Sequence, residues 1–170
     1  RQAVLKLSTK LTKAKTWGRT KIVGDIRFFE NFESKILNNK RRIFVWLPRG
    51  YKINPQKKYP VLYMQDGQNL IDPNTSYSGY DWKVDETANR LIKNFKIKEI
   101  IIVGIDNTND RLEEYSNSEK GKNYLQFLTT ELKPFIDSNF RTLADRDNTA
   151  IMGSSMGGLI SFLAVWNHPE

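Results

Sequence analysis

A serine lies at the centre of a glycine-rich segment, residues 153–157 (GSSMG), which fits the pattern G-x-S-x-G. Glycines two places before and after Ser155 permit a sharp turn from a strand into a helix, where a Cβ atom would clash. Such a turn presents the Ser155 hydroxyl at the carboxyl end of the strand, and the N–H of Met156 then faces a developing oxyanion. The pattern predicts a nucleophile at Ser155; the alternative is an ordinary Gly/Ser-rich turn between a strand and a helix.

The remaining chemistry is limited by one histidine, His168, and by the absence of cysteine. Disulfides, thiolate metal sites, a cysteine nucleophile and a three-histidine zinc site are therefore excluded, and we expect no cofactor and no metal. His168 follows Ser155 by 13 residues, which is roughly 20 Å along a helix. A base must lie within about 2.6–3.2 Å of the oxygen atom whose proton it accepts. We therefore expect His168 to be a surface or helix-end residue.

The elements around Ser155 follow from the spacing of the apolar residues. Residues 1–16 form either an edge strand or a frayed start, and residues 50–58 and 106–118 are predicted as loops. Pro134 should kink or restart the predicted helix that contains it, residues 124–136. Strands that alternate with helices indicate an α/β fold with a mostly parallel sheet. The expected strands are 22–28, 42–47, 59–65, 99–105 and 148–153, and the expected helices are 82–95, 124–136 and 159–166.

Several longer segments, in this order, resemble one known family: 42–51 (RIFVWLPRGY), 59–71 (YPVLYMQDGQNLI), 103–115 (VGIDNTNDRLEEY), 128–141 (LTTELKPFIDSNFR) and 153–158 (GSSMGG). The chain from about Gly24 to its end resembles the putative-esterase family of α/β-hydrolases, which includes esterase D-like, feruloyl and enterochelin esterases. That family often has His where this chain has Gln65. The resemblance implies an α/β-hydrolase sheet, mostly parallel with antiparallel N-terminal strands.

The resemblance also implies hydrolysis of a small-molecule ester or thioester by a Ser-His-acid triad, through an acyl-enzyme on Ser155. Met156 would supply one oxyanion N–H, and the second would come from the loop after residues 59–65, from Gly67, Gln68 or Asn69. Asp66 either orients that loop or is a simple turn former. Arg111, Glu114 and Tyr115 resemble the family's Arg-x-x-Glu-Tyr segment. They either line the pocket or form a structural ion pair and a buried ring, and we favour the second.

Only 15 residues follow Ser155, whereas an α/β-hydrolase places its acid and histidine after the nucleophile. We therefore expect residues 1–170 to be one incomplete α/β-hydrolase domain that stops after the helix following Ser155. The catalytic acid and histidine would lie beyond residue 170, and the 170-residue chain alone would be inactive. An open sheet edge favours association, so a homo-oligomer remains an alternative. The competing function is a non-catalytic binding module on a degenerate hydrolase fold.

Composition and charge restrict the partners. The chain has 170 residues, 39% apolar and 27% charged, and a net charge of +8. Residues 1–60 hold 16 Lys and Arg against 3 acids, and residues 61–170 hold 11 against 16. The basic residues 1–60 have two interpretations. They form an arm that binds nucleic acid or a membrane surface, or they form a solvated segment beside acidic neighbours. We favour the second, because no nucleic-acid signature accompanies them. No apolar run approaches a membrane span. No signal peptide is visible, so we expect a cytoplasmic protein. The chain begins with Arg1 rather than Met, so we expect the natural N-terminus to be missing.

Overall fold

The computed structural model describes residues 22–169, so the alternatives for residues 1–16 lie outside the described residues. No helix in the described residues is both long and apolar enough to cross a membrane. The elements, in chain order, are β1 (Asp25–Ser34), β2 (Asn39–Leu47), α1 (Gly50–Ile53), β3 (Val61–Gln65), η1 (Gly67–Asn69), α2 (Val84–Lys93), β4 (Ile101–Ile105), α3 (Arg111–Glu114), α4 (Glu119–Phe127), η2 (Leu128–Leu132), α5 (Lys133–Asn139), η3 (Arg146–Asn148), β5 (Thr149–Met152) and α6 (Met156–Asn167).

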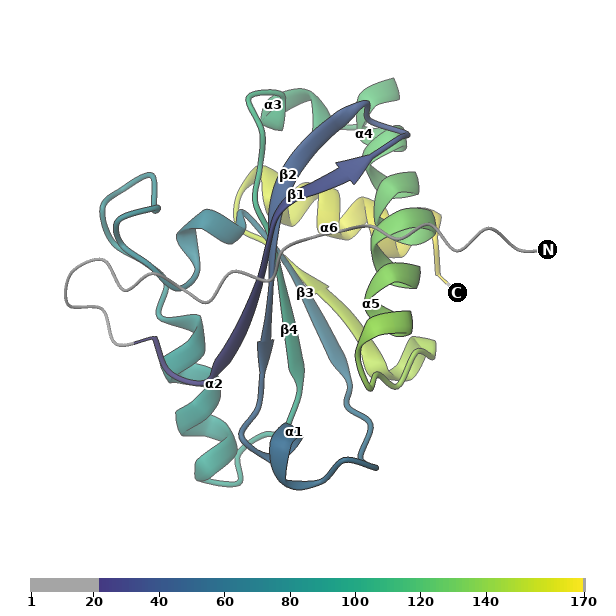
Figure 1. Ribbon diagram of the computed structural model, residues 1–170. Helices are drawn as coiled ribbons and strands as arrows, with labels where there is room; N and C mark the ends of the chain where they lie inside the picture. The colour runs from purple at the N-terminus through teal and green to yellow at the C-terminus, as the bar shows by residue number, and fades with distance from the viewer. Residues whose placement is uncertain (1–21, 170) are drawn as a thin grey trace.

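One five-stranded sheet, in the order β1-β2-β4-β3-β5, organises these elements. The pairs β1/β2 and β2/β4 are antiparallel, whereas β3 pairs in parallel with both β4 and β5. The expected α/β sheet with antiparallel N-terminal strands is therefore confirmed. Because the carboxyl ends of β4, β3 and β5 meet at one edge, the loops that follow these strands lie side by side (Figure 1).

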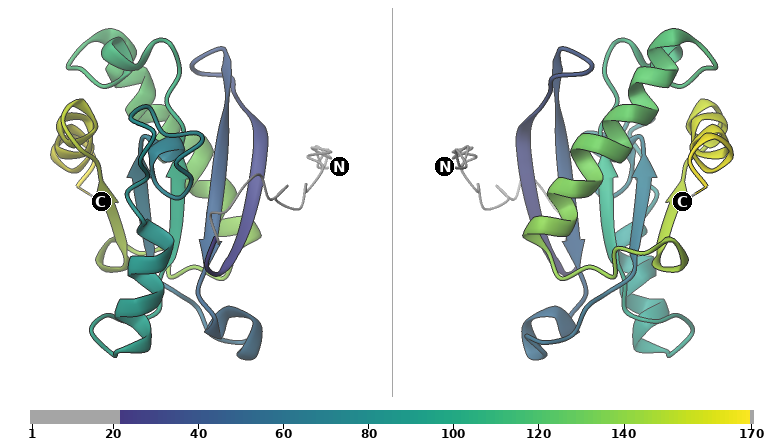
Figure 2. Two further views of the ribbon diagram at one scale, coloured as in Figure 1. Left: turned by 90° about the vertical axis from the view of Figure 1, so that its left-hand side faces the viewer. Right: turned by 90° about the vertical axis from the view of Figure 1, so that its right-hand side faces the viewer.

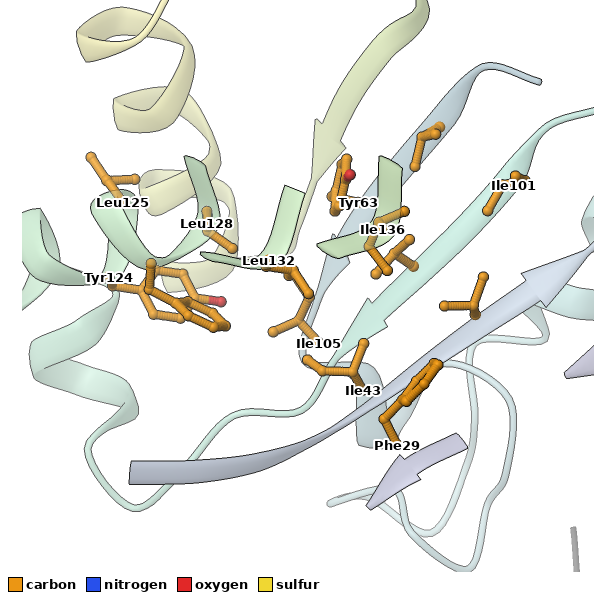
Figure 3. Packing of buried hydrophobic residues seen from close by; sticks show 14 of the residues in the cluster. Phe29, Ile43, Tyr63, Ile101, Ile105, Tyr124, Leu125, Leu128, Leu132 and Ile136 are labelled. Atoms are coloured by element: carbon orange, nitrogen blue, oxygen red, sulfur yellow. The ribbon is translucent and has the colours of Figure 1, made fainter. Parts of the chain in front are cut away.

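Helices cover both faces of the sheet. The segment α4–η2–α5 and helix α6 lie on one face and α2 lies on the other (Figures 1 and 2). The larger apolar core lies under α4–η2–α5, where aromatic and aliphatic side chains from strands and helices interdigitate (Figure 3). A smaller core between α2 and the sheet contains Phe44, Trp46, Met64, Leu70, Ile71, Ala88 and Ile102.

The first strand differs from its predicted bounds. Residues 22–28 were predicted to form it, but β1 begins at Asp25 and continues to Ser34. Gly24 has a φ of +110°, a conformation outside the strand region, and the indole Nε1–H of Trp46 donates to the carbonyl oxygen of Val23. The far end was missed because the register shifts between Phe29 and Phe32. Such a bulge interrupts the alternation by which a strand is recognised.

Two segments predicted as loops contain short helices. Residues 50–58 include α1, and residues 106–118 include α3. Each helix has four residues, which is too short to show a helical period in the sequence. The prediction for Pro134 is confirmed: it lies in the first turn of α5, directly after the π-helical turn η2. Proline is tolerated there because the first N–H groups of a helix have no partner within it.

The side of the sheet at β5 is the least covered part of the described chain. β5 pairs with β3 alone, and Met152 at its end is 51% exposed. Helix α6 buries Gly157, Ile160 and Ser161, but four of its apolar side chains are exposed. These are Leu159, Phe162, Val165 and Trp166. The rings of Phe162 and Trp166 stack on each other with centroids 5.9 Å apart.

Candidate active site

Ser155 occupies a sharp turn between β5 and α6. Its backbone has φ 53° and ψ −123°, a region that side-chain-bearing residues rarely adopt. The residue is exposed, and its carbonyl oxygen accepts the N–H groups of Gly158 and Leu159 at 2.9 and 3.1 Å. The helix therefore starts directly from the strained residue. This geometry presents the Ser155 hydroxyl to solvent at the carboxyl edge of the sheet.

The two glycines of the segment are required by close backbone approach. A Cβ atom on Gly153 would lie 2.3 Å from the carbonyl oxygen of Gly157, which is closer than real Cβ contacts. A Cβ atom on Gly157 would lie 3.2 Å from both Asp66 Oδ2 and Gln65 Cβ. The first turn of α6 thus packs tightly on the strand that leads into it and on the end of β3.

Met156, the first residue of α6, carries an N–H that the helix cannot satisfy internally. The next two N–H groups are used, because Gly157 donates to the carbonyl of Ser154 at 2.8 Å and Gly158 donates to that of Ser155. The N-terminus of a helix also carries a partial positive charge. The Met156 N–H is therefore suitably placed to stabilise negative charge that develops beside Ser155.

A second turn, η1, follows β3 at the same edge of the sheet. Asp66 precedes it in the left-handed conformation, with φ 57° and ψ 48°, and its carbonyl accepts the Asn69 N–H at 2.9 Å. Of the three N–H groups predicted as oxyanion donors, that of Asn69 is thus already engaged. Gly67 is buried, whereas Gln68 is partly exposed. Gly67 and Gln68 therefore remain as the candidate donors, and Gln68 is the more exposed residue of the two.

The carboxylate of Asp66 is bound by residues that follow β4. Arg111 donates from Nε to Oδ1 at 2.7 Å and from Nη2 to Oδ2 at 2.8 Å, and Asn107 Nδ2 donates to Oδ1 at 2.6 Å. The Asp66 side chain is 3% exposed. Asp66 therefore orients the loop as well as forming the turn. Sequence reasoning missed Asn107, because its partner lies 41 residues away and no local pattern links them.

Glu114 and Tyr115 do not line an open pocket, because both are fully buried. Glu114 accepts two hydrogen bonds from the buried guanidinium of Arg41, at 2.7 and 3.2 Å. The Tyr115 hydroxyl accepts the Asp66 N–H at 3.4 Å, and burial raises the pKa of Tyr115 above its ordinary value. The two residues thus form the ion pair and buried ring that the sequence offered as an alternative. Arg111 is the one member of the group whose side chain reaches solvent.

Asp106 lies behind the η1 turn and pairs with Arg42 Nε at 2.9 Å. Burial raises the pKa of Asp106 to about 6, although Arg42 opposes this shift. Asp106 Oδ1 would lie 2.6 Å from a Cβ atom on Gly67. This carboxylate therefore packs closely against the turn at Gly67.

The remaining histidine and carboxylates considered as catalytic or metal-binding groups lie away from Ser155 along the chain. His168 caps the C-terminus of α6, a helix of 12 residues, which places it about 18 Å along the helix from its start. Asp145 accepts hydrogen bonds from Asn148 in the turn before β5, as expected of a turn residue. Within residues 22–169, one set of carboxylates has oxygens within 4.8 Å of one another, as a cation site requires: Asp81, Asp85 and Glu86, at the start of α2.

Comparison with known proteins identifies the family. The family model described as "Putative esterase" matches residues 34–170. The chain belongs to this family. Among curated proteins, the chain is similar to an "Endo-1,4-beta-xylanase/feruloyl esterase" of Xylanibacter ruminicola, with 36% identity over 130 residues, or 74% of this chain.

Solved structures agree with this membership. A ferulic acid esterase is 33% identical with a TM-score of 0.69, and the match covers 86% of this chain. An IroE-like serine hydrolase from Shewanella oneidensis is 26% identical with a TM-score of 0.67 over 84% of this chain. The chain spans 18% of the xylanase/feruloyl esterase and 56% and 46% of the two solved proteins. It therefore corresponds to a part of these relatives.

Proposed function

We propose that this chain is the nucleophile-bearing part of a serine carboxylic-ester hydrolase. The observation that carries the proposal is the backbone of Ser155, held at φ 53° and ψ −123° with its side chain exposed between a strand and a helix N-terminus. Strain of this kind costs roughly 1–3 kcal/mol and persists at functional sites. Membership of the esterase family and the likeness to a ferulic acid esterase support the same reaction class.

In the proposed reaction, Ser155 Oγ attacks the carbonyl carbon of the ester while a base takes the hydroxyl proton. The N–H groups of Met156 and Gln68 stabilise the resulting oxyanion. Collapse of this intermediate breaks the ester C–O bond, the alcohol leaves with the proton from the base, and the acyl group stays on Ser155. Water activated by the same base then releases the acid. The base and its acid partner are a histidine and a carboxylate beyond residue 170.

The test uses the full-length gene product with p-nitrophenyl acetate and a fluorophosphonate probe. We expect ester hydrolysis and covalent labelling at Ser155. Ser155→Ala should abolish labelling and lower turnover by about 10⁶-fold, whereas the neighbouring exposed Ser154→Ala should retain both. Hydrolysis that survives Ser155→Ala, or labelling at another residue, would overturn the proposal.

Residues 1–170 expressed alone should be inert, because Ser155 without a base hardly ionises at neutral pH. Adding the polypeptide that follows residue 170 in the gene should restore labelling. Labelling of Ser155 in the lone chain would show that a base exists within it. A non-catalytic binding module instead predicts an inert full-length protein whose affinity for an anionic polymer falls steeply with salt.

A further inference from the structure

The ion pair between Arg111 and Asp66 lies where the two turns of the proposed site meet. Arg111 comes from α3 after β4, and Asp66 follows β3. Asp66 Oδ2 is also 3.2 Å from the position that a Cβ atom on Gly157 would take, in the first turn of α6 after β5. One guanidinium–carboxylate pair therefore lies between the segments that follow three neighbouring parallel strands.

Asp66 sets the course of the η1 turn through its backbone. Its left-handed φ and ψ turn the chain away from β3, and its carbonyl receives the Asn69 N–H that closes the turn. The proposed donor, the N–H of Gln68, lies within this closed turn. A carboxylate held in place restricts the backbone of Asp66, and through it the turn that carries the Gln68 N–H.

The two hydrogen bonds from Arg111 hold the carboxylate in both position and rotation. A bidentate guanidinium defines the plane of its partner, which the single ammonium of lysine cannot do. Asn107 adds a third bond to the same carboxylate, and its own N–H donates to Gln68 Oε1 at 3.2 Å. The β4 loop thus holds the turn on both sides of Gly67.

We propose that Arg111 is a positioning residue of the esterase site, which holds the Gln68 N–H in register with the Met156 N–H through the carboxylate of Asp66. This inference rests on the proposed function. Arg111 is 27% exposed, so a direct contact with an anionic group of the substrate is the competing role. The charge of Arg111 is already paired with Asp66, which makes positioning the better account.

The experiment measures kcat and KM of the full-length gene product for p-nitrophenyl acetate and for a carboxylate-bearing ester. Variants are Arg111→Gln and Arg111→Lys. The matched control is Arg27→Gln, because Arg27 makes the same two-pronged pair with Asp25 at the start of β1. Active-site titration counts the folded sites, so that loss of fold is separated from loss of rate per site.

For Arg111→Gln we expect kcat per site to fall about 100-fold for both esters with KM nearly unchanged, since a displaced oxyanion donor costs roughly 10²–10³-fold. For Arg111→Lys, kcat per site should fall by about 10-fold, and added guanidinium ion should partly restore the kcat of Arg111→Gln. For the control Arg27→Gln, kcat per site should stay within twofold of wild type. A kcat per site within twofold of wild type, or a KM increase confined to the carboxylate-bearing ester, would overturn the inference alone. A wild-type protein without activity would overturn the proposed function and this inference together.

Discussion

Asp66 and Ser155 occupy comparable places after the neighbouring parallel strands β3 and β5, and both are non-glycine residues with a positive φ. Their surroundings differ. Asp66 is 2% exposed and its carboxylate receives three hydrogen bonds. Ser155 is exposed, and its ψ of −123° places it outside the left-handed region that Asp tolerates.

The difference teaches how each conformation persists. At Asp66 the side chain itself stabilises the turn, because removing it would leave Arg111 and Asn107 without their acceptor. At Ser155 the surrounding backbone imposes the conformation, through the close approach of Gly153 to Gly157. The first residue is thus a structural support, and the second is a strained residue at the place of the proposed nucleophile.

Replacing the two side chains by alanine gives the largest expected difference. Asp66→Ala should lower the free energy of unfolding by about 3 kcal/mol, because it leaves a partly buried guanidinium unpaired. Ser155→Ala should change it by less than about 0.5 kcal/mol. Urea unfolding of the full-length product measures both, with Asp25→Ala as the control for a more exposed Asp–Arg pair. Equal losses for Asp66→Ala and Ser155→Ala would remove the contrast.

The backbone origin of the strain at Ser155 can be tested at its glycines. Gly153→Ala places a Cβ atom 2.3 Å from a carbonyl oxygen of the backbone, whereas Gly157→Ala meets its neighbours at 3.2 Å. We expect Gly153→Ala to lower the free energy of unfolding by about 2–3 kcal/mol and to abolish labelling of Ser155. Gly157→Ala should lower the free energy of unfolding by about 1 kcal/mol. The reverse order, measured by thermal unfolding and probe labelling, would contradict this account.

A second carboxylate, Asp85, sharpens the comparison because it is buried without a paired cation. None of the ion pairs between residues 22 and 169 involves it, and its Oδ2 accepts the Val23 N–H at 2.8 Å. Burial, and then the neighbouring Glu86, raise the pKa of Asp85 from 3.8 to about 7.

A raised pKa means that the folded state binds the proton more tightly, so this contribution to stability is complete below about pH 4 and is lost as the pH rises through about 7. Asp85→Asn mimics the protonated form. It should raise the free energy of unfolding by on the order of 1 kcal/mol at pH 8 and by a smaller amount at pH 5, inside the window in which the contribution is being lost. Denaturant unfolding at both pH values checks this, and an equal destabilisation at both would refute it.

The smallest effect concerns relief of strain at the nucleophile. Ser155→Gly should raise the free energy of unfolding by about 0.5–1 kcal/mol while abolishing turnover, because glycine adopts a positive φ without penalty. Ser154→Gly, at a residue without a positive φ, should be neutral or slightly destabilising. Asp66→Gly should be destabilising although it relieves the same kind of φ. A gain in stability for Asp66→Gly would break the comparison.

The parts of the site that sequence predicts are those with local causes. The strand, glycines and helix around Ser155 lie within 20 residues, and short-range sterics determine them. The supports of the second turn depend on pairs far apart in the chain: Arg111 lies 45 residues from Asp66, and Arg41 lies 73 residues from Glu114. Helix α3 was missed because its four residues are too few to show a helical period, and two of them, Arg111 and Glu114, are held by such distant partners. Local periodicity carries no information on such pairs.

The exposed face of α6 bears on how this protein is synthesised. A chain leaves the ribosome with its N-terminal part first, so the five strands and both cores described above can form before any segment that follows residue 170 emerges. During that interval the stacked Phe162 and Trp166 rings and the open edge of β5 face water. We expect chaperones to bind a nascent chain of this length at α6. A pause in translation at this point should increase aggregation of the nascent chain, because the apolar side of α6 stays uncovered for longer.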